Sequence, residues 1–586
     1  MNTHYTTERH TQILIALMKF HGVRKVVASP GVANSTFNAS LQCDPYFEIY
    51  SSVDERSAAY IACGLAAESG EPVALSCTGS TASRNYAPGL TEAFYRKLPV
   101  LAVTATRDPS CVGNAVQQVI DRSRPMADIA MESVLLEPVH SEHDEWACGV
   151  AVNKALIALR KNGGGPAHIN LVTTHCSDFS AMELPKVKGI THIERFSEMP
   201  PLEGYKRVAI LVGVHNRWDA SLLGVVDKFC GLYNAVVLMS HASNYKGDYG
   251  VNHALIVSMK HYDTVELRTA DLVIYIGSIP RYLSSIRKDA EMWRVNPDGI
   301  IRDPEKTLTK VFAMSEQDFF EHYTALRNEC KESGYAKLWQ QEYESIISQM
   351  PEVPFSNVWV ARHAIGKLPE GCVLHMAGSN TARAWNFFKL PKSVECYSND
   401  GAMGIDGQVS ALIGESLASP ERLHFGVVGD LTFFYDMNSL GNRHVGRNLR
   451  LMVINNGMGA EFRIYSNPAF HFGEDTKPFI AAAGHFGDRS PRLLRHYAED
   501  LGFEYLSASN EEECLKNLER FLAPQLTERP MLFEIFTLDK DESDAIYAMN
   551  HIVQDKKRVA KDIAKNAIKS VAGEKGVAAV KKLFGR

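Results

Sequence analysis

The sequence predicts an α/β protein made of three doubly wound parallel-sheet domains in series. Short apolar runs of strand character alternate with helical stretches along most of the 586 residues, which is the rhythm of βαβ units. Two stretches that resemble linkers, at residues 183–207 and 349–354, interrupt this rhythm. The predicted units are an N-terminal domain over residues 1–185, a central domain over 186–350, a third domain over 351–547 and a C-terminal tail over 548–586.

The first domain is expected to open with a helix over residues 7–20, for which Thr7 can supply the cap. The apolar face of this helix would comprise Ile13, Leu14, Leu17 and Met18. Its strands are expected at residues 25–28, 47–51, 73–76, 100–103 and 168–171. In the central domain, strands are expected at residues 207–213, 235–239 and 272–277.

The composition is that of a globular protein, with 45% hydrophobic and 22% charged residues. No apolar run approaches the roughly 20 residues that a membrane span requires, and the N-terminus lacks the features of a signal peptide. The eleven cysteines are scattered without a Cys-x-x-Cys pair, so reduced thiols in a cytoplasmic protein are expected. The net charge of −6 argues against general nucleic-acid binding.

Two strands of the third domain end in polar loops. One apolar run leads into Asp430, and a second leads into the pair Asn455-Asn456, so that Asn456 follows Asp430 by 26 positions. A short crossover helix over residues 436–440 would bring both loops to the same carboxyl edge of one parallel sheet. The sequence therefore predicts that these polar side chains lie close together.

The oxygen atoms expected at this edge suit Mg²⁺. The carboxylate of Asp430, the amide oxygen of Asn456 and a nearby main-chain carbonyl are hard ligands that leave room for water and a substrate phosphate. Glycines allow a diphosphate to approach the backbone closely, and they stand here at Gly429, Gly457 and Gly459. The alternative is that both loops are ordinary turns after buried strands.

A second candidate lies in the first domain. A strand ends at Val53 and an Ala-rich helix follows, so Glu55 is expected at a helix N-terminus and at a sheet edge. A carboxylate in that place can act as an acid or base. The alternative is that it serves only the helix dipole, as acidic residues in first turns commonly do.

Taken together, these motifs resemble thiamine diphosphate (ThDP) enzymes, in which Gly-Asp-Gly is followed at a similar distance by a double Asn; Leu431 replaces the second glycine here. The chain is most similar to the family of 2-succinyl-5-enolpyruvyl-6-hydroxy-3-cyclohexene-1-carboxylate (SEPHCHC) synthases, over about residues 7–545. The likeness is carried by Ser29-Pro-Gly31, Asp54-Glu-Arg-Ser57, Cys77-Thr-Gly-Ser-Thr-Ala82 and Tyr397-Ser-Asn-Asp-Gly-Ala-Met-Gly-Ile-Asp-Gly407.

This resemblance implies a pyrimidine-binding first domain and a diphosphate-binding third domain, with ThDP and Mg²⁺ as cofactors. Glu55 would be the carboxylate beside the pyrimidine nitrogen N1′, and Gln117 would face the reacting carbon as a positioning residue. Mg²⁺ would be held by Asp430, Asn456 and the carbonyl of Met458. The pyrimidine would be held by Asn399, Met403, Gly404 and Ile405, and the diphosphate would lie against Gly429, Asp430, Leu431, Thr432, Asn456, Met458, Gly459 and Ala460.

The substrate positions depart from the family pattern. Val32-Ala33 stands where the family has Ser-Arg, Asp400 replaces an arginine, and Glu461-Phe462 replaces Ile-Phe. Losing two guanidinium groups and gaining two acids reverses the local field for dianionic substrates. The candidate substrate residues are Thr81, Arg107, Arg281, Asn380, Arg383, Asp400, Glu461 and Phe462.

The expected function is a ThDP- and Mg²⁺-dependent 2-oxo acid decarboxylase and carboligase that resembles SEPHCHC synthase and acts on a divergent substrate. Its partners would be a small 2-oxo acid and an acceptor. In this family the Glu and the diphosphate domain come from different subunits, which implies a homodimer or homotetramer. Two alternatives stay open: an acetolactate-synthase-like pyruvate ligase, and a catalytically silent subunit that binds or regulates.

The C-terminal segment over residues 551–586 holds ten basic and three acidic residues, a net charge of +7. Apolar residues recur at helical spacing among its lysines, so one hypothesis is a helix packed on its own subunit. The other is a surface helix that binds anionic lipid or an acidic partner and places the enzyme at the inner face of the membrane.

Overall fold

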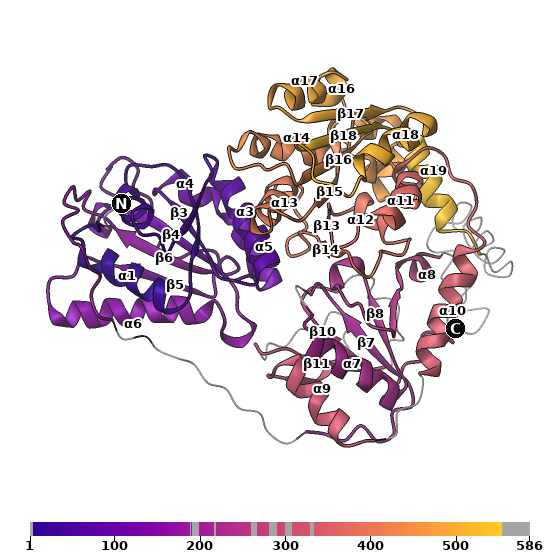
Figure 1. Ribbon diagram of the computed structural model, residues 1–586, viewed down its shortest axis with the longest axis horizontal. Helices are drawn as coiled ribbons and strands as arrows, with labels where there is room; N and C mark the ends of the chain where they lie inside the picture. The colour runs from indigo at the N-terminus through magenta and orange to yellow at the C-terminus, as the bar shows by residue number, and fades with distance from the viewer. Residues whose placement is uncertain are drawn as a thin grey trace, which may run out of the picture.

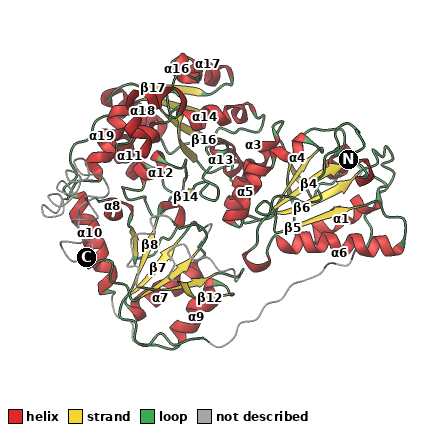
Figure 2. Cartoon of the chain, turned by 180° about the vertical axis from the view of Figure 1, so that it is seen from behind, coloured by secondary structure: helices red, strands yellow, loops and turns green. Residues whose placement is uncertain are grey.

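The computed structural model describes residues 4–187, 189, 199–215, 218–259, 266–280, 290–298, 308–328 and 333–553. Three six-stranded parallel sheets follow one another along the chain (Figure 1), so the prediction of three α/β units in series is confirmed. Figure 2 shows the sheets with helices packed around them. No helix in the described part of the chain is long and apolar enough to cross a membrane.

The first sheet has the strand order β2-β1-β3-β4-β6-β5. Its strands are β1 (Lys25–Ala28), β2 (Glu48–Ser51), β3 (Val73–Cys77), β4 (Val100–Thr106), β5 (Glu132–Leu136) and β6 (Ala167–Val172). The helices are α1 (Arg9–Phe20), α2 (Ser35–Gln42), α3 (Glu55–Ser69), α4 (Thr81–Asn85), α5 (Ala87–Arg96) and α6 (Glu142–Ala158). Helices α1 and α6 cover one face of the sheet, while α3 and α5 cover the other.

The central sheet has the order β12-β11-β10-β7-β8-β9, which is the doubly wound arrangement common among nucleotide-binding proteins. Its strands are β7 (Val208–Val212), β8 (Ala235–Met239), β9 (Gly250–Asn252), β10 (Leu272–Ile276), β11 (Glu291–Val295) and β12 (Leu308–Phe312). Its helices are α7 (Ala220–Tyr233), α8 (Ala254–Ser258), α9 (Glu316–Ala325) and α10 (Gly334–Ile347).

The third sheet has the order β14-β13-β15-β16-β18-β17. Its strands are β13 (Val373–Met376), β14 (Glu395–Tyr397), β15 (His424–Gly429), β16 (Leu449–Asn455), β17 (Glu504–Ala508) and β18 (Met531–Phe536). Its α-helices are α11 (Asn357–Ala364), α12 (Asn380–Trp385), α13 (Gln408–Ala418), α14 (Asp430–Asp436), α15 (Thr476–Phe479), α16 (Phe486–Arg489), α17 (Leu493–Asp500), α18 (Glu511–Phe521) and α19 (Asp539–Met549). The short 3₁₀ segments include η6 (Met437–Gly441), η7 (Ala460–Arg463) and η8 (Pro468–Asp475).

The first and third domains pack on each other through α3 and α13. The contact is close because each helix presents a glycine to the backbone of the other. A Cβ on Gly64 would lie 1.9 Å from the carbonyl oxygen of Ala411, and a Cβ on Gly414 would lie 2.0 Å from that of Ile61. Any larger residue at either position would force the two helices apart.

The structure differs from the sequence predictions in several details, among them three central strands that were not predicted, β9, β11 and β12. Thr7 does not cap α1, because the N-cap residue is Glu8 and it makes no side-chain capping bond. The crossover helix begins at Asp430 itself rather than at residue 436. Strand β5 was missed because it is an edge strand with most of its residues only partly buried, so it lacks the continuous apolar run of a buried strand.

Candidate active site

The two predicted loops of the third domain meet at one edge. Strands β15 and β16 are parallel neighbours, with Gly429 opposite Ile454, so the loops that follow them leave the sheet side by side. Asp430 is 4% exposed as the first residue of α14. Burial raises the pKa of Asp430 to about 7, against backbone N–H groups of Leu431 and Gly457 that lower it. The contact with Gly457 joins the carboxyl group to the second loop.

The side chains of Asn455 and Asn456 differ in their hydrogen bonding. Asn455 is fully engaged, since its Nδ2 donates to Oε1 of Glu534 at 2.6 Å and its Oδ1 accepts the N–H of Gly457 at 3.1 Å. In contrast, Oδ1 of Asn456 is buried and has no hydrogen-bond partner. Leaving a buried acceptor unsatisfied costs about 1–3 kcal/mol, so this oxygen is available to a water molecule or a cation.

The donor set at this edge fits Mg²⁺. It combines a carboxylate, the free amide oxygen of Asn456 and the carbonyl of Met458, which accepts the N–H of Ala460 at 3.0 Å and keeps a second lone pair. Among the described residues, no group of three His, Cys, Asp or Glu side chains could hold a metal. A metal here would therefore rely on one carboxylate together with neutral oxygens and ligands from a bound phosphate.

The remaining predicted diphosphate residues surround this point. Gly429 caps α14, Leu431 is half-buried and Thr432 is buried. The N–H of Gly459 donates to the carbonyl of Ala481 at 2.7 Å, and Ala460 begins η7. Gly457 has a φ of 75°, a left-handed conformation that only glycine adopts without strain.

A loop over residues 399–405 connects β14 to α13 and carries the predicted pyrimidine residues. Asn399 is buried, and its Nδ2 donates to the carbonyl of Gly407 at 3.1 Å. Met403 has a positive φ of 53° and is 55% exposed, so a long apolar side chain stands in an unfavourable backbone conformation. Gly404 and Ile405 are half-buried beside it.

Two buried residues of α5, which the sequence reasoning did not find, hold this loop from the first domain. Glu92 accepts the N–H groups of Gly401 and Ala402 at 3.2 and 2.8 Å, and Nη1 of Arg96 donates to Oδ1 of Asn399 at 3.4 Å. Burial raises the pKa of Glu92 to about 7. No motif marks these residues, since a Glu and an Arg four positions apart are also typical of an exposed helix face.

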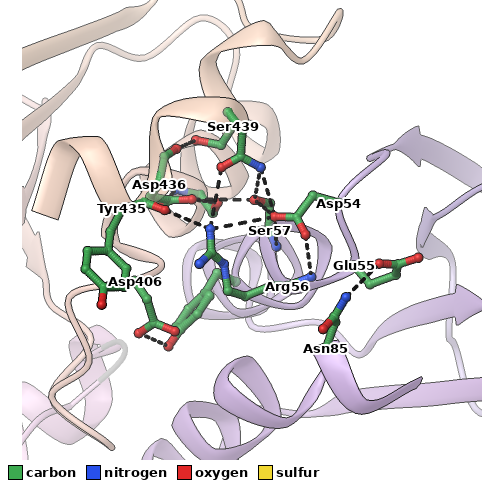
Figure 3. A network of polar contacts seen from close by, with 12 residues as sticks. Asp54, Glu55, Arg56, Ser57, Asn85, Asp406, Tyr435, Asp436 and Ser439 are labelled. Atoms are coloured by element: carbon green, nitrogen blue, oxygen red, sulfur yellow. Dashed lines mark hydrogen bonds and ion pairs between the residues drawn. The ribbon is translucent and has the colours of Figure 1, made fainter. Parts of the chain in front are cut away.

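Glu55 is the first residue of α3, as predicted. The helix is capped by Asp54, which accepts the N–H groups of Arg56 and Ser57. Glu55 itself accepts a hydrogen bond from Nδ2 of Asn85 at 3.2 Å (Figure 3). Gln117 lies exposed in the loop that follows β4, next to Gln118, whose φ is 59°.

The junction that carries Glu55 is fastened to the third domain by polar contacts (Figure 3). Nδ2 of Asn438 donates to Asp54 at 2.9 Å, and Nη2 of Arg56 donates to the carbonyl of Tyr435 at 2.8 Å. Asp436, at the end of α14, is buried and accepts the N–H and the hydroxyl of Ser410, each at 2.6 Å. Helix α14 therefore begins at Asp430 and ends at the contacts that position the start of α3.

The candidate substrate residues fall into two groups. Arg383 forms a two-pronged ion pair with Glu461, with distances of 3.0 and 3.1 Å, and also donates to Asn380 at 2.7 Å. Ser379, which the sequence reasoning did not name, donates to Glu461 at 2.7 Å. These residues lie together after β13 and β16, so the arginine is already neutralised by an acid of this chain.

The other candidates are not part of that cluster. Asp400 is 2% exposed and accepts the hydroxyl of Ser398 at 2.8 Å, so it lies at the contact with the first domain instead of opening to solvent. Phe462 is partly exposed beside Glu461, while Thr81 and Arg107 are exposed at the carboxyl edge of the first sheet. Arg281 and residues 554–586 of the basic tail lie outside the described residues.

Comparisons with known proteins agree with this geometry. A family model described as "Thiamine pyrophosphate enzyme, N-terminal TPP binding domain" matches residues 9–124. The SEPHCHC synthase of Phocaeicola vulgatus is 32% identical over 562 residues, which cover 92% of this chain and 98% of that protein. The synthase of Bacteroides thetaiotaomicron is 30% identical over 553 residues, covering 91% of this chain and 96% of that protein.

The fold also matches a solved structure. The thiamine diphosphate-dependent 4-hydroxybenzoylformate decarboxylase of Rhodococcus jostii RHA1 superposes with a TM-score of 0.66, covering 90% of this chain and 99% of that one. The two sequences are 16% identical, so this likeness concerns the fold alone.

Proposed function

This chain belongs to the SEPHCHC synthase family of thiamine diphosphate enzymes, which decarboxylate a 2-oxo acid and form a carbon–carbon bond, and we propose that it performs this reaction on a substrate pair of its own. The observation that carries the proposal is the buried, unpartnered Oδ1 of Asn456 beside Asp430. It supports a cation at the carboxyl edge of the third sheet, where ThDP enzymes place their diphosphate.

In this proposal Mg²⁺ is held by Asp430, Asn456 and the carbonyl of Met458. The diphosphate lies against the backbone of Gly429, Leu431, Thr432, Gly459 and Ala460. When bound, ThDP supplies the electron sink that decarboxylation of a 2-oxo acid requires. The residues of this chain supply the position, the charge balance and the proton transfers.

Glu55 is proposed to hold the proton at N1′ of the pyrimidine. Its place at the start of α3 and its hydrogen bond from Asn85 fix the direction of the carboxylate, as a proton-transfer group requires. Asn399, Met403, Gly404 and Ile405 would hold the pyrimidine ring, and Met403 has the apolar side chain and the exposure to pack beneath it. Gln117 would orient the substrate.

The substrate is proposed to differ from that of the family because Arg383 is already paired with Glu461. Glu461 engages both terminal nitrogens of Arg383, so this guanidinium offers little attraction to a second carboxylate. Val32 is 77% exposed where the family carries a polar residue. These features favour a 2-oxo acid or an acceptor with fewer carboxylates than the pair that the family joins.

We also propose a homodimer or homotetramer that acts in the cytoplasm. This proposal rests on the family, in which the Glu and the diphosphate domain come from different subunits; the α3–α13 contact described above joins two domains of one chain. For residues 551–586 we propose attraction to anionic lipid on the inner membrane face, since each basic residue near such a surface contributes up to about 1 kcal/mol. Co-sedimentation of full-length and truncated protein with anionic vesicles at two salt concentrations tests it; equal sedimentation of both forms would remove the tail from membrane binding.

The function is tested by turnover of a panel of 2-oxo acids, with and without acceptors, in the presence of ThDP and Mg²⁺. We expect carbon dioxide release from at least one monocarboxylic 2-oxo acid and poor formation of the SEPHCHC product. Efficient SEPHCHC synthesis would contradict the divergent pocket. Product formation from pyruvate alone would favour the acetolactate-synthase-like alternative, and no turnover of any acid, despite ThDP binding, would favour a silent subunit.

A further inference from the structure

Three polar side chains lie fully buried beneath the loop over residues 399–405. His375 belongs to β13, and Gln408 and Glu415 belong to α13; all three are 0% exposed. Nδ1 of His375 lies 2.9 Å from Oε1 of Glu415, and Nε2 of His375 lies 3.0 Å from Oε1 of Gln408. The Nε2 of Gln408 then donates to the carbonyl of Gly404 at 2.7 Å. A continuous chain of contacts thus runs from the sheet to the loop.

The hydrogen-bonding pattern determines where the protons lie among these three side chains. Gln408 must turn its NH₂ group toward the carbonyl of Gly404, because a carbonyl can only accept. Its own oxygen therefore faces His375, whose Nε2 must donate. One proton also lies between Nδ1 of His375 and Oε1 of Glu415, because two such atoms 2.9 Å apart need a proton between them.

The electrostatics agree with this proton count. Burial lowers the pKa of His375, but the charge of Glu415 and the hydrogen bonds to Glu415 and Gln408 outweigh burial, so the pKa is raised overall. Arg96 of the first domain opposes this effect. A buried polar pair of this kind is seldom more stable than well-packed apolar side chains of the same volume. We therefore expect the pair to act by orienting Gln408.

We propose that His375 and Glu415 are positioning residues that orient Gln408. Gln408 in turn fixes the carbonyl of Gly404 and so holds the loop over residues 399–405 in the shape that receives the cofactor's pyrimidine. The inference rests on the proposed cofactor role of this loop. Glu92 holds the opposite side of the same loop through the N–H groups of Gly401 and Ala402. The loop is thus fixed by an acceptor from the first domain and a donor from the third.

The test uses Gln408→Glu, which keeps the size of the side chain and an acceptor for His375 but removes the donor to Gly404. Gln408→Leu removes both contacts and serves as a second variant. The matched control is His424→Gln in the neighbouring strand β15, because His424 is equally buried yet bonds to Arg422 and Asn448, away from the loop. Each full-length protein is loaded with ThDP and Mg²⁺.

Three quantities are measured: the dissociation constant of ThDP, the rate at which the C2 proton of bound ThDP exchanges with deuterium, and the melting temperature. We expect both Gln408 variants to slow the exchange by about 10²-fold, the cost of misplacing a reacting group by about 1 Å. The diphosphate contacts are intact, so the dissociation constant should change far less. The control should keep the wild-type exchange rate even if its melting temperature falls.

The outcomes separate this inference from the proposed function. Wild-type protein that neither binds ThDP nor exchanges the proton would defeat the proposed function. Wild-type protein that exchanges normally, alongside Gln408 variants that exchange equally fast, would overturn the positioning role while leaving the function in place. If one Gln408 variant does not fold, the other gives the same comparison. Slow exchange in the His424→Gln control would show that any change in the core slows the exchange, and this would also overturn the positioning role.

Discussion

The first and third domains of this protein repeat one topology and differ in chemistry. Numbered within each domain, both sheets have the order 2-1-3-4-6-5, and in each the helix after the second strand packs against its counterpart through a glycine. The third domain ends its third and fourth strands in Asp430 and the Asn455-Asn456 pair. The equivalent strands β3 and β4 of the first domain are followed directly by Thr78 and Arg107 instead.

From this difference we infer that the shared fold positions the carboxyl edges of the sheets, while the residues in the loops determine which groups each edge can bind. The carboxyl edge of the third sheet presents the carboxylate of Asp430 and the unpartnered amide oxygen of Asn456, for which we propose a cation and a diphosphate. That of the first sheet presents a carboxylate, Glu55, at the start of a helix. One cofactor that needs both an anchored diphosphate and a proton-transfer group requires one edge of each kind. The contacts of Figure 3 fasten the start of α3 to the third domain of the same chain.

Asp430→Ala should have the largest effect, because it removes the carboxylate that directly follows β15 at the third edge. We expect Mg²⁺-dependent ThDP binding to be lost, since a hard cation loses its anionic protein ligand. Calorimetric titration of ThDP with Mg²⁺ measures this. Asp500→Ala, which removes an exposed acid from α17 of the same domain, is the control and should bind as wild type. Retained affinity in Asp430→Ala would reduce the motif to a pair of turns.

Glu55→Gln tests the other edge. Turnover should fall by about 10²–10⁴-fold, the range for losing a positioned acid–base group, while ThDP still binds because the diphosphate site is untouched. Steady-state kinetics and calorimetry together separate the two effects. Glu71→Gln, an exposed residue just beyond α3, should have no effect on either. A Glu55→Gln enzyme with near-normal turnover removes this carboxylate from the mechanism.

Glu92→Gln tests the contact between the first and third domains through the pH dependence of stability. The folded-state pKa of Glu92 is raised from 4.5 to about 7, so the native state binds the proton more tightly than the unfolded state does. The contribution of Glu92 to the free energy of unfolding should therefore be fully present below pH 4.5 and should be lost as the pH rises through about 7, by at most about 3 kcal/mol. Denaturant unfolding between pH 4.5 and 8 should show a shallower decline in the variant; identical slopes would contradict the assignment.

Glu461→Gln affects only the substrate cluster of the third domain. Removing the acid frees Arg383 for a carboxylate, so the use of dicarboxylic 2-oxo acids such as 2-oxoglutarate should improve by about tenfold, equivalent to about 1.4 kcal/mol. The ratio of kcat/KM for 2-oxoglutarate to that for a monocarboxylic acid measures it. The variant Arg383→Gln, which removes the cation, should not show the gain. An unchanged ratio in Glu461→Gln would place Arg383 outside the substrate pocket.

Local sequence patterns predicted a large part of this comparison. The three sheets, the meeting of Asp430 with the Asn455-Asn456 loop, and the helix that begins at Glu55 all follow from strand runs and short spacings. Each involves residues near in sequence or elements whose order is constrained by right-handed βαβ connections.

Contacts between distant segments could not be predicted. Three contacts join residues 40 to 310 positions apart: the Arg383–Glu461 pair, the hydrogen bonds of Glu92 to the loop over residues 399–405, and the buried His375–Glu415 pair. Glu and Arg side chains are usually found at the surface, and only the packed structure shows that Glu92 and Glu415 are buried while Arg383 and Glu461 stay partly exposed. The distinction between the engaged Asn455 and the free Asn456 likewise depends on Glu534, 79 residues from Asn455.

The most direct test of the central claim is the effect of Asn456→Leu on two properties of one protein. If the unpartnered oxygen of Asn456 is held for Mg²⁺, replacing it with an apolar group of similar size should stabilise the cofactor-free protein by about 1–3 kcal/mol, because a buried unsatisfied acceptor is removed. The same change should weaken Mg²⁺-dependent ThDP binding by more than about tenfold. A cofactor-free protein that is not stabilised and binds ThDP with wild-type affinity would contradict the claim.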